Sequence, residues 1–232
     1  MRAIVAELIG TAMLLVAVVG SGIMGDRLSG GNVAIALLAN SIATGGALTV
    51  LILMFGPISG AHFNPVVSIA DAAQGGLSWS EAAQYVVAQI VGAFFGVPVA
   101  DLMFSEPVYS VSTHVRSGWP LALSECVATF GLLAVIWSCS RRRPAVVPFA
   151  VGAYITSAYW FTSSTSFANP AVTLARSATN TFTGIRPADV PTFLVAQVIG
   201  AVAATLLFGW LLPVAKVHVE HNSEKGAGRV AV

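Results

Sequence analysis

Two asparagine-proline pairs are the residues whose types and spacing point most directly to a chemical role. Asn64-Pro65 and Asn169-Pro170 each follow a break inside a long apolar stretch, and the residues after them are Val66 and Ala171. Asparagine is a preferred helix N-cap, and proline at the first helical position loses no hydrogen bond. Each pair therefore predicts a helix start whose spare asparagine N–H donates to a passing neutral oxygen.

The composition excludes several other kinds of chemistry. Of the 232 residues, 56% are hydrophobic and only 9% are charged, with a formal charge of +1. A soluble domain carries about 25% charged residues, and a nucleic-acid-binding domain carries a basic patch. The sequence shows no nucleotide-binding loop, metal-ligand spacing or nucleophile constellation, so we expect neither an enzyme nor a cofactor. Cys126 and Cys139 lie within one predicted helix and do not predict a disulfide.

Long windows without charged residues predict membrane-spanning helices, because about 20 apolar residues cross a hydrocarbon core about 30 Å thick. Two windows contain breaks rich in Gly, Pro, Ser or Thr, at 55–60 and 162–166, and each break is followed by a short apolar piece. We predict two half-length helices, which begin at Asn64 and Asn169. We also predict six full helices, near residues 3–24, 33–54, 81–104, 119–139, 145–162 and 188–213.

The distribution of basic residues predicts the orientation of these spans. Six helices place both termini on one side of the membrane, and an excess of Lys and Arg marks the cytoplasmic side. The terminal side has seven basic residues: Arg2, Arg141, Arg142, Arg143, Lys216, Lys225 and Arg229. The opposite side has four: Arg27, Arg116, Arg176 and Arg186. We expect a multi-pass protein of a bacterial-type inner membrane with cytoplasmic termini.

The two halves of the chain repeat one another. Glu7-Leu8-Ile9-Gly10-Thr11 matches Glu125-Cys126-Val127-Ala128-Thr129, and the Asn-Pro pairs follow in the same order. Each half has three spans, so the second half must enter the membrane from the opposite face. We expect one membrane domain over 1–217, with inverted repeats at about 1–110 and 115–217 and a flexible tail at 218–232. The two half-helix N-termini would meet in mid-membrane, where their positive dipole ends repel cations.

Three features of the sequence resemble the aquaporin, or major intrinsic protein, superfamily. They are the stretch from Ile58 to Val66, the partner Asn169-Pro170-Ala171 and the two glutamate-containing helix starts. The resemblance covers essentially the whole chain. It implies an all-α membrane protein with an aquaporin-like right-handed bundle of six transmembrane helices and two re-entrant half-helices. It also implies a homotetramer in the lipid bilayer, one pore per subunit lined by both asparagines, and passive conduction of small neutral solutes. Val66 departs from the alanine usual in the first motif.

The outer constriction departs from the pattern of the family's water channels, which place an arginine directly after the second motif. Val172 occupies that position here. Counting without gaps, Thr44 and Ser157 replace an aromatic residue and a histidine, and Ser166 takes the loop position. This set predicts a wider, neutral filter without strict water selectivity. Arg176, one turn beyond Val172, either restores positive charge in the outer vestibule or faces headgroups or a neighbouring loop.

The run 169–177, with 163–167 before it, is similar to bacterial aquaporin-like channels associated with arsenic resistance. This similarity implies arsenite as the favoured permeant, since As(OH)3 is neutral and presents hydroxyls much as a small polyol does. The alternative within the class is a general water or glycerol facilitator. The Arg-Asp pair of glycerol facilitators is replaced here by Val172-Thr173.

Other polar residues in the apolar windows leave two roles open. Glu7 and Glu125 are either proton-relay groups of a proton-coupled secondary transporter or, as the family resemblance implies, structural braces that accept hydrogen bonds from the half-helix loops. His62 either lines the inner pore or is a hydrogen-bonded loop histidine. Gln89 and Gln197 recur at matched positions and are interpreted as interhelical hydrogen-bonding groups.

Overall fold

The computed structural model describes residues 1–212, which fold into helices and connecting loops without a strand. The predicted tail at 218–232 lies outside the described residues. The α-helices are α1 (Arg2–Leu28), α2 (Val33–Ser59), α3 (Pro65–Ala73), α4 (Trp79–Met103), α5 (Trp119–Arg142), α6 (Val147–Phe161), α7 (Pro170–Ala175) and α8 (Val190–Leu211). Three short 3-10 helices are η1 (Pro144–Val146), η2 (Arg176–Ala178) and η3 (Pro187–Asp189).

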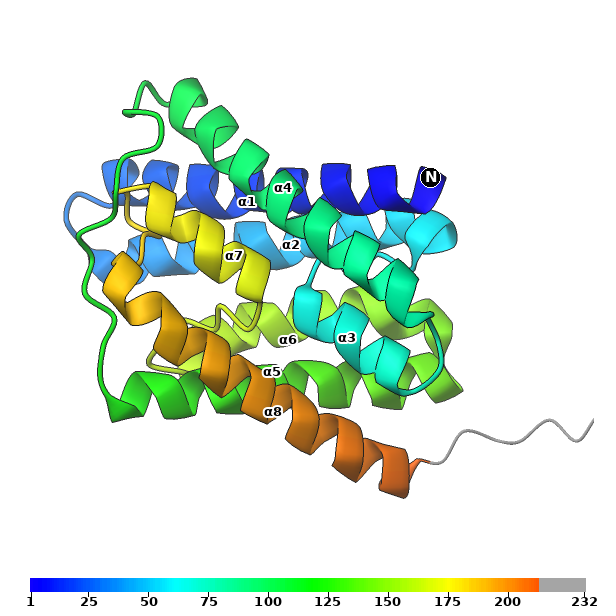
Figure 1. Ribbon diagram of the computed structural model, residues 1–232. Helices are drawn as coiled ribbons and strands as arrows, with labels where there is room; N and C mark the ends of the chain where they lie inside the picture. The colour runs from blue at the N-terminus through cyan, green and yellow to red at the C-terminus, as the bar shows by residue number, and fades with distance from the viewer. Residues whose placement is uncertain (213–232) are drawn as a thin grey trace, which may run out of the picture.

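The short helices α3 and α7 lie inside a bundle of six long ones. Figure 1 shows that they extend from the middle of the molecule toward opposite sides, α3 toward the side of the N-terminus and α7 away from it. The packing of the two halves corresponds: α1 contacts α4 and α2, while α5 contacts α8 and α6. Both α3 and α7 contact α4 and α8, so each half-helix packs against a long helix of the other half.

Within residues 1–212, five helices are long and apolar enough to cross a membrane: α1, α2, α4, α5 and the segment Pro187–Leu211 that includes α8. The sixth predicted span is α6, with 15 residues. At 1.5 Å per residue α6 rises about 22 Å, and η1 adds about 6 Å immediately before it. Together these two elements approach the thickness of a hydrocarbon core.

The two predicted half-helix starts are confirmed. The side-chain oxygen of Asn64 accepts a hydrogen bond from the backbone N–H of Val66 at 3.2 Å, and a proline follows at the first helical position. Asn169 caps α7 in the same way, accepting from Ala171 at 3.0 Å and Val172 at 3.3 Å. These caps satisfy helix N–H groups that have no intrahelical partner.

The predicted break at 55–60 is wrong in position, because α2 continues through Gly56 and Pro57 to Ser59. A transmembrane helix tolerates proline when neighbouring groups compensate for the missing backbone hydrogen bond. Pro57 lies in the last turn, and the chain leaves the helix at Gly60, whose φ of 84° is a left-handed conformation that glycine adopts without steric cost.

Glycines at repeat-matched positions allow close helix approaches. A Cβ on Gly92 of α4 would lie 2.2 Å from the backbone oxygen of Leu8 in α1. A Cβ on Gly200 of α8 would lie 2.3 Å from the backbone oxygen of Cys126 in α5. Small residues that allow backbones to touch are a common means of helix association in membranes, where burial of apolar surface does not drive packing.

We expect Gly92→Ala to lower the free energy of unfolding by about 1–3 kcal/mol, because the added methyl group forces α1 and α4 apart. Thermal unfolding of the protein in detergent, followed by tryptophan fluorescence, measures the shift. Gly46→Ala in α2 is the matched control, since a Cβ there meets no atom within 4 Å. Equal unfolding midpoints for the two variants would contradict the packing role of Gly92.

Candidate pore

A cavity of about 220 Å3 runs between the two halves of the bundle. Its apolar sides come from α1, α2, α5 and α6, through residues such as Leu14, Ile52 and Leu132. Part of its polar lining comes from the loops that precede α3 and α7, where both Asn64 and Asn169 line it. The cavity therefore combines an apolar surface with a few polar groups from segments far apart in the sequence.

The two loops before the half-helices share an unusual backbone. Ala61 and Phe63 have φ of 52° and 49°, and Ser166 and Ala168 have φ of 50° and 47°. Each residue of the second pair follows its equivalent in the first by 105 positions, the separation of Asn64 from Asn169. Non-glycine residues rarely adopt this left-handed conformation, and such strain concentrates at functional sites.

The two asparagines fasten the halves to each other in the middle of the molecule. The Asn64 side-chain NH2 donates to the backbone oxygen of Ala168 at 2.8 Å, and the Asn169 NH2 donates to the backbone oxygen of Phe63, also at 2.8 Å. Each amide has two N–H donors, so one remains for a molecule in the cavity. The arrangement offers hydrogen bonds to a neutral solute beside two helix N-termini that repel cations.

Glu7 holds the first loop. Its carboxylate accepts hydrogen bonds from the backbone N–H groups of His62 at 3.0 Å and Phe63 at 2.7 Å. It also accepts from the Ser59 hydroxyl at 2.6 Å and the Gln89 amide at 2.8 Å. Glu7 is fully buried, so these bonds satisfy backbone donors that water does not reach.

Glu125 holds the second loop by the same construction. Its carboxylate accepts from the backbone N–H groups of Phe167 and Ala168, each at 2.9 Å, and from the Gln197 amide at 2.6 Å. The two glutamines also link the carboxylates to the half-helices, since Gln89 donates to Ser68 and Gln197 donates to Thr173 at 2.9 Å. These contacts are the hydrogen bonds that the structural-brace interpretation of Glu7 and Glu125 requires.

His62 combines both roles left open by the sequence. It lines the cavity on the side of the N-terminus, and its Nδ1 lies 3.1 Å from the Ser68 hydroxyl. Its ring meets that of Tyr85 edge to face, with centroids 5.5 Å apart. A histidine held on two sides presents one fixed ring surface to the cavity.

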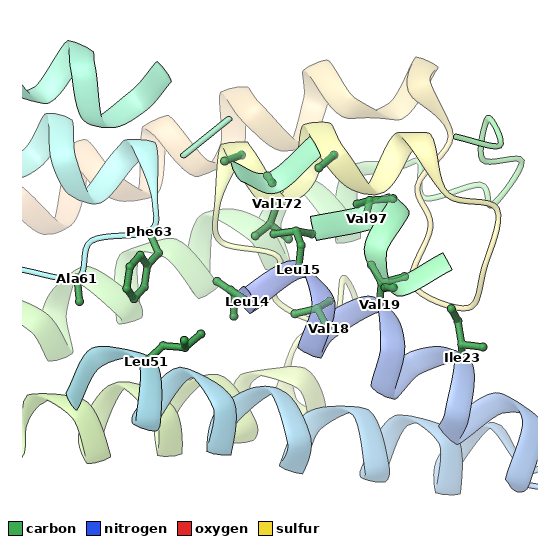
Figure 2. Packing of buried hydrophobic residues seen from close by; sticks show 14 residues of the cluster. Leu14, Leu15, Val18, Val19, Ile23, Leu51, Ala61, Phe63, Val97 and Val172 are labelled. Atoms are coloured by element: carbon green, nitrogen blue, oxygen red, sulfur yellow. The ribbon is translucent and has the colours of Figure 1, made fainter. Parts of the chain in front are cut away.

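Thr44, Ser166 and Val172 all line the opposite part of the cavity. The Ser166 hydroxyl is buried and has no hydrogen-bond partner among the described residues. Val172 belongs to an apolar cluster with Leu14 and Leu15 of α1, as Figure 2 shows. The wall here is therefore apolar beside Val172 and hydroxyl-bearing beside Thr44 and Ser166.

The placement of Ser157 at the filter is wrong. Its side chain is exposed on the outside of α6 and bonds to the backbone oxygen of Ala153 at 2.9 Å. Tyr159 lines the cavity instead, and its hydroxyl lies 3.3 Å from that of Thr44. Successive helix residues are rotated by about 100°, so an error of two positions in an ungapped count turns the side chain to the other face.

Arg176 lies in the cavity wall and is 2% exposed. Its Nε donates to the backbone oxygen of Thr183, and its guanidinium carbon lies 3.4 Å from the centre of the Phe167 ring. Its terminal amino groups make no hydrogen bond within residues 1–212. Arg176 therefore both lines the cavity, one turn beyond Val172, and bonds to the neighbouring loop at Thr183. The cavity wall here includes a cation beside the neutral residues Thr44, Ser166 and Val172.

Arg116, from the connection between α4 and α5, supports this end of the cavity. Its guanidinium donates to the backbone oxygen of Gly184 at 2.7 Å and lies 5.1 Å from the centre of the Phe167 ring. Burial lowers the pKa of Arg116, while the Glu125 carboxylate acts in the opposite direction. The ring of Phe167 therefore has two guanidinium groups against it, which fix the loop that carries Ser166.

Tyr159 and Asp71 line the cavity, and the sequence analysis does not identify either of them. Asp71 lines the end of the cavity near the N-terminus. It ends the charge-free window that starts at Val33, and it lies seven residues after Asn64, as Arg176 lies seven after Asn169. Extending the repeat comparison past the Asn-Pro pairs would have found Asp71, because an ionisable residue in a membrane segment is a functional candidate.

Comparison with known proteins identifies the family. The family model described as "Major intrinsic protein" matches residues 1–162 and 144–230. Aquaglyceroporin AqpS of Rhizobium meliloti is 53% identical over 226 residues, which are 97% of both chains. Aquaporin NIP2-2 of Zea mays is 33% identical over 193 residues, covering 79% of this chain and 64% of that protein.

A solved structure agrees at the level of the fold. The X-ray structure of the aquaglyceroporin from Plasmodium falciparum superposes with a TM-score of 0.71 at 23% identity, covering 89% of this chain and 94% of that one. The predicted all-α, aquaporin-like fold is thereby confirmed. The chain belongs to the major intrinsic protein family of multi-pass membrane channels, which are not enzymes.

Proposed function

We propose that this channel conducts small neutral solutes passively, with arsenite as the favoured permeant and some flux of water or small polyols. The observation that carries the proposal is the mixed wall around Val172. Thr44, Tyr159 and Ser166 bring three hydroxyl-bearing residues to the same cavity as the apolar Val172. As(OH)3 is uncharged and presents three hydroxyls, which such a wall accommodates by hydrogen bonding.

The alternative permeants are water and glycerol. Their support is the name of the relative that is 53% identical, an aquaglyceroporin. An aquaglyceroporin pore and an arsenite pore have similar requirements, because both permeants are small, neutral and hydroxylated. Position 172 has a valine, which is smaller than the arginine of the family's water channels. This difference supports permeation by glycerol or arsenite, and not by water alone.

We further propose that residues 1–217 form one channel unit that assembles as a homotetramer in the inner membrane with cytoplasmic termini. The orientation rests on the seven basic residues of the terminal side against four on the other. The assembly rests on the family resemblance. Large apolar side chains exposed along α2, α4 and α8, such as Ile42, Phe95 and Leu206, provide surfaces for lipid and neighbouring subunits.

Val172→Arg is expected to reduce arsenite-driven swelling of proteoliposomes at least tenfold while water flow persists. The new guanidinium would enter a cavity of about 220 Å3 that already contains Arg176. Stopped-flow light scattering under separate sucrose, glycerol and arsenite gradients measures the three fluxes. Val172→Thr is the matched control, because it keeps the size of the side chain, and it should conduct arsenite at least half as fast as the wild type.

If arsenite fails to cross in the wild type while water or glycerol does, arsenite is not a permeant. The protein is then a general facilitator with an unusual filter. If Val172→Arg conducts arsenite like the wild type, Val172 does not form the constriction.

The alternative that this protein is a proton-coupled secondary transporter is tested with Glu7→Gln. The brace predicts that solute flux needs no ion gradient and that Glu7→Gln lowers stability by about 1–3 kcal/mol, because a buried backbone donor loses its acceptor. Swelling with and without a pH gradient, together with thermal unfolding, reports both effects. Glu81→Gln, at an exposed helix start, is the control. Wild-type flux that requires a pH gradient, and that Glu7→Gln abolishes at unchanged stability, would favour the transporter.

A further inference from the structure

Asp71 and Arg176 are a matched pair of opposite charges at the two ends of the cavity. Each lies seven residues after the asparagine that caps its half-helix. Asp71 is in the last turn of α3, and Arg176 follows the last residue of α7. Figure 1 shows that the half-helices extend to opposite sides of the molecule, so the repeat places the two charges at opposite ends.

Neither charge is neutralised within the described residues. Arg176 is the only lysine or arginine, and Asp71 the only carboxylate, among the described residues that line the cavity. The Asp71 carboxylate takes part in no hydrogen bond or ion pair within residues 1–212. A Cβ on Gly76 would lie 2.3 Å from a carboxylate oxygen of Asp71, so glycine at this position leaves space for the carboxylate.

The other fixed charges and dipoles of the pore oppose cations. Arg176 carries a full positive charge, and the N-termini of α3 and α7 add positive partial charge in the middle. The asparagine amides present N–H donors, which bind anions as readily as neutral oxygens. These groups repel cations but attract small anions, and a channel for neutral solutes must also exclude anions to preserve the membrane potential.

We propose that Asp71 is the anion barrier of this pore. The proposal rests on the passive-channel function and adds a specificity-determining residue at the mouth on the side of the N-terminus. A carboxylate beside a narrow cavity repels an anion that passes it at short range. A neutral solute passes without this penalty, so Asp71 discriminates by charge and not by size.

Iodide influx tests the proposal directly. Proteoliposomes contain a halide-quenched fluorophore, and potassium iodide is added outside with valinomycin to carry the counter-ion. Asp71→Asn and Asp71→Ser should each raise the iodide influx at least tenfold over the wild type. Asp71→Glu keeps the charge and should remain as impermeable to iodide as the wild type. Glu81→Gln removes a carboxylate on the same side, outside the cavity, and should also leave the influx unchanged.

Glycerol swelling of the same vesicles shows whether each pore is open. The proposal is overturned if either neutral variant passes glycerol and stays as impermeable to iodide as the wild type. It is also overturned if Glu81→Gln raises iodide influx as much as Asp71→Asn does. A wild type that conducts glycerol but not arsenite would contradict the arsenite proposal alone, because the iodide comparison uses glycerol as its reference.

Discussion

The structure depends on satisfying the hydrogen bonds of backbone that enters an apolar interior without being helical. Two loops interrupt the bundle, and their N–H groups have neither water nor a helical partner there. Glu7 and Glu125 accept those donors, and Asn64 and Asn169 connect each loop to the other half. Without these acceptors the half-helices would leave unsatisfied groups in a medium where each is costly.

This constraint also explains why the two halves share so much detail. Three features recur 105 to 118 positions apart: the glutamates, the glutamines that donate to them and the left-handed loop residues. They recur because each loop has buried backbone N–H groups that need acceptors, on opposite sides of the molecule. The two repeats differ in sequence where the two ends of the pore wall carry different side chains. Asp71 and Arg176 occupy equivalent positions with opposite charges, so the two mouths differ electrostatically on an otherwise repeated frame.

The sequence predicts features with local causes well. The half-helix starts follow from Asn-Pro capping, and the bundle follows from charge-free windows. The filter was predicted less completely, because counting along α6 is sensitive to small errors and placed Ser157 where Tyr159 lies. Partners that depend on tertiary packing, such as Phe167 between Arg116 and Arg176, have no signal in local sequence. The predicted end of the second helix near 54 falls short of Ser59, because the Gly- and Pro-containing stretch 55–60 indicates a break where the structure continues the helix.

The most direct measurement of the central claim is arsenite flux through the wild-type protein in vesicles that contain no ion gradient. A passive pore for a neutral hydroxylated solute predicts swelling several times faster than in protein-free vesicles, without saturation and with a weak temperature dependence. Swelling equal to that of protein-free vesicles under arsenite, in preparations that still pass glycerol, would contradict arsenite permeation. Failure of glycerol and water to cross as well would contradict passive conduction itself.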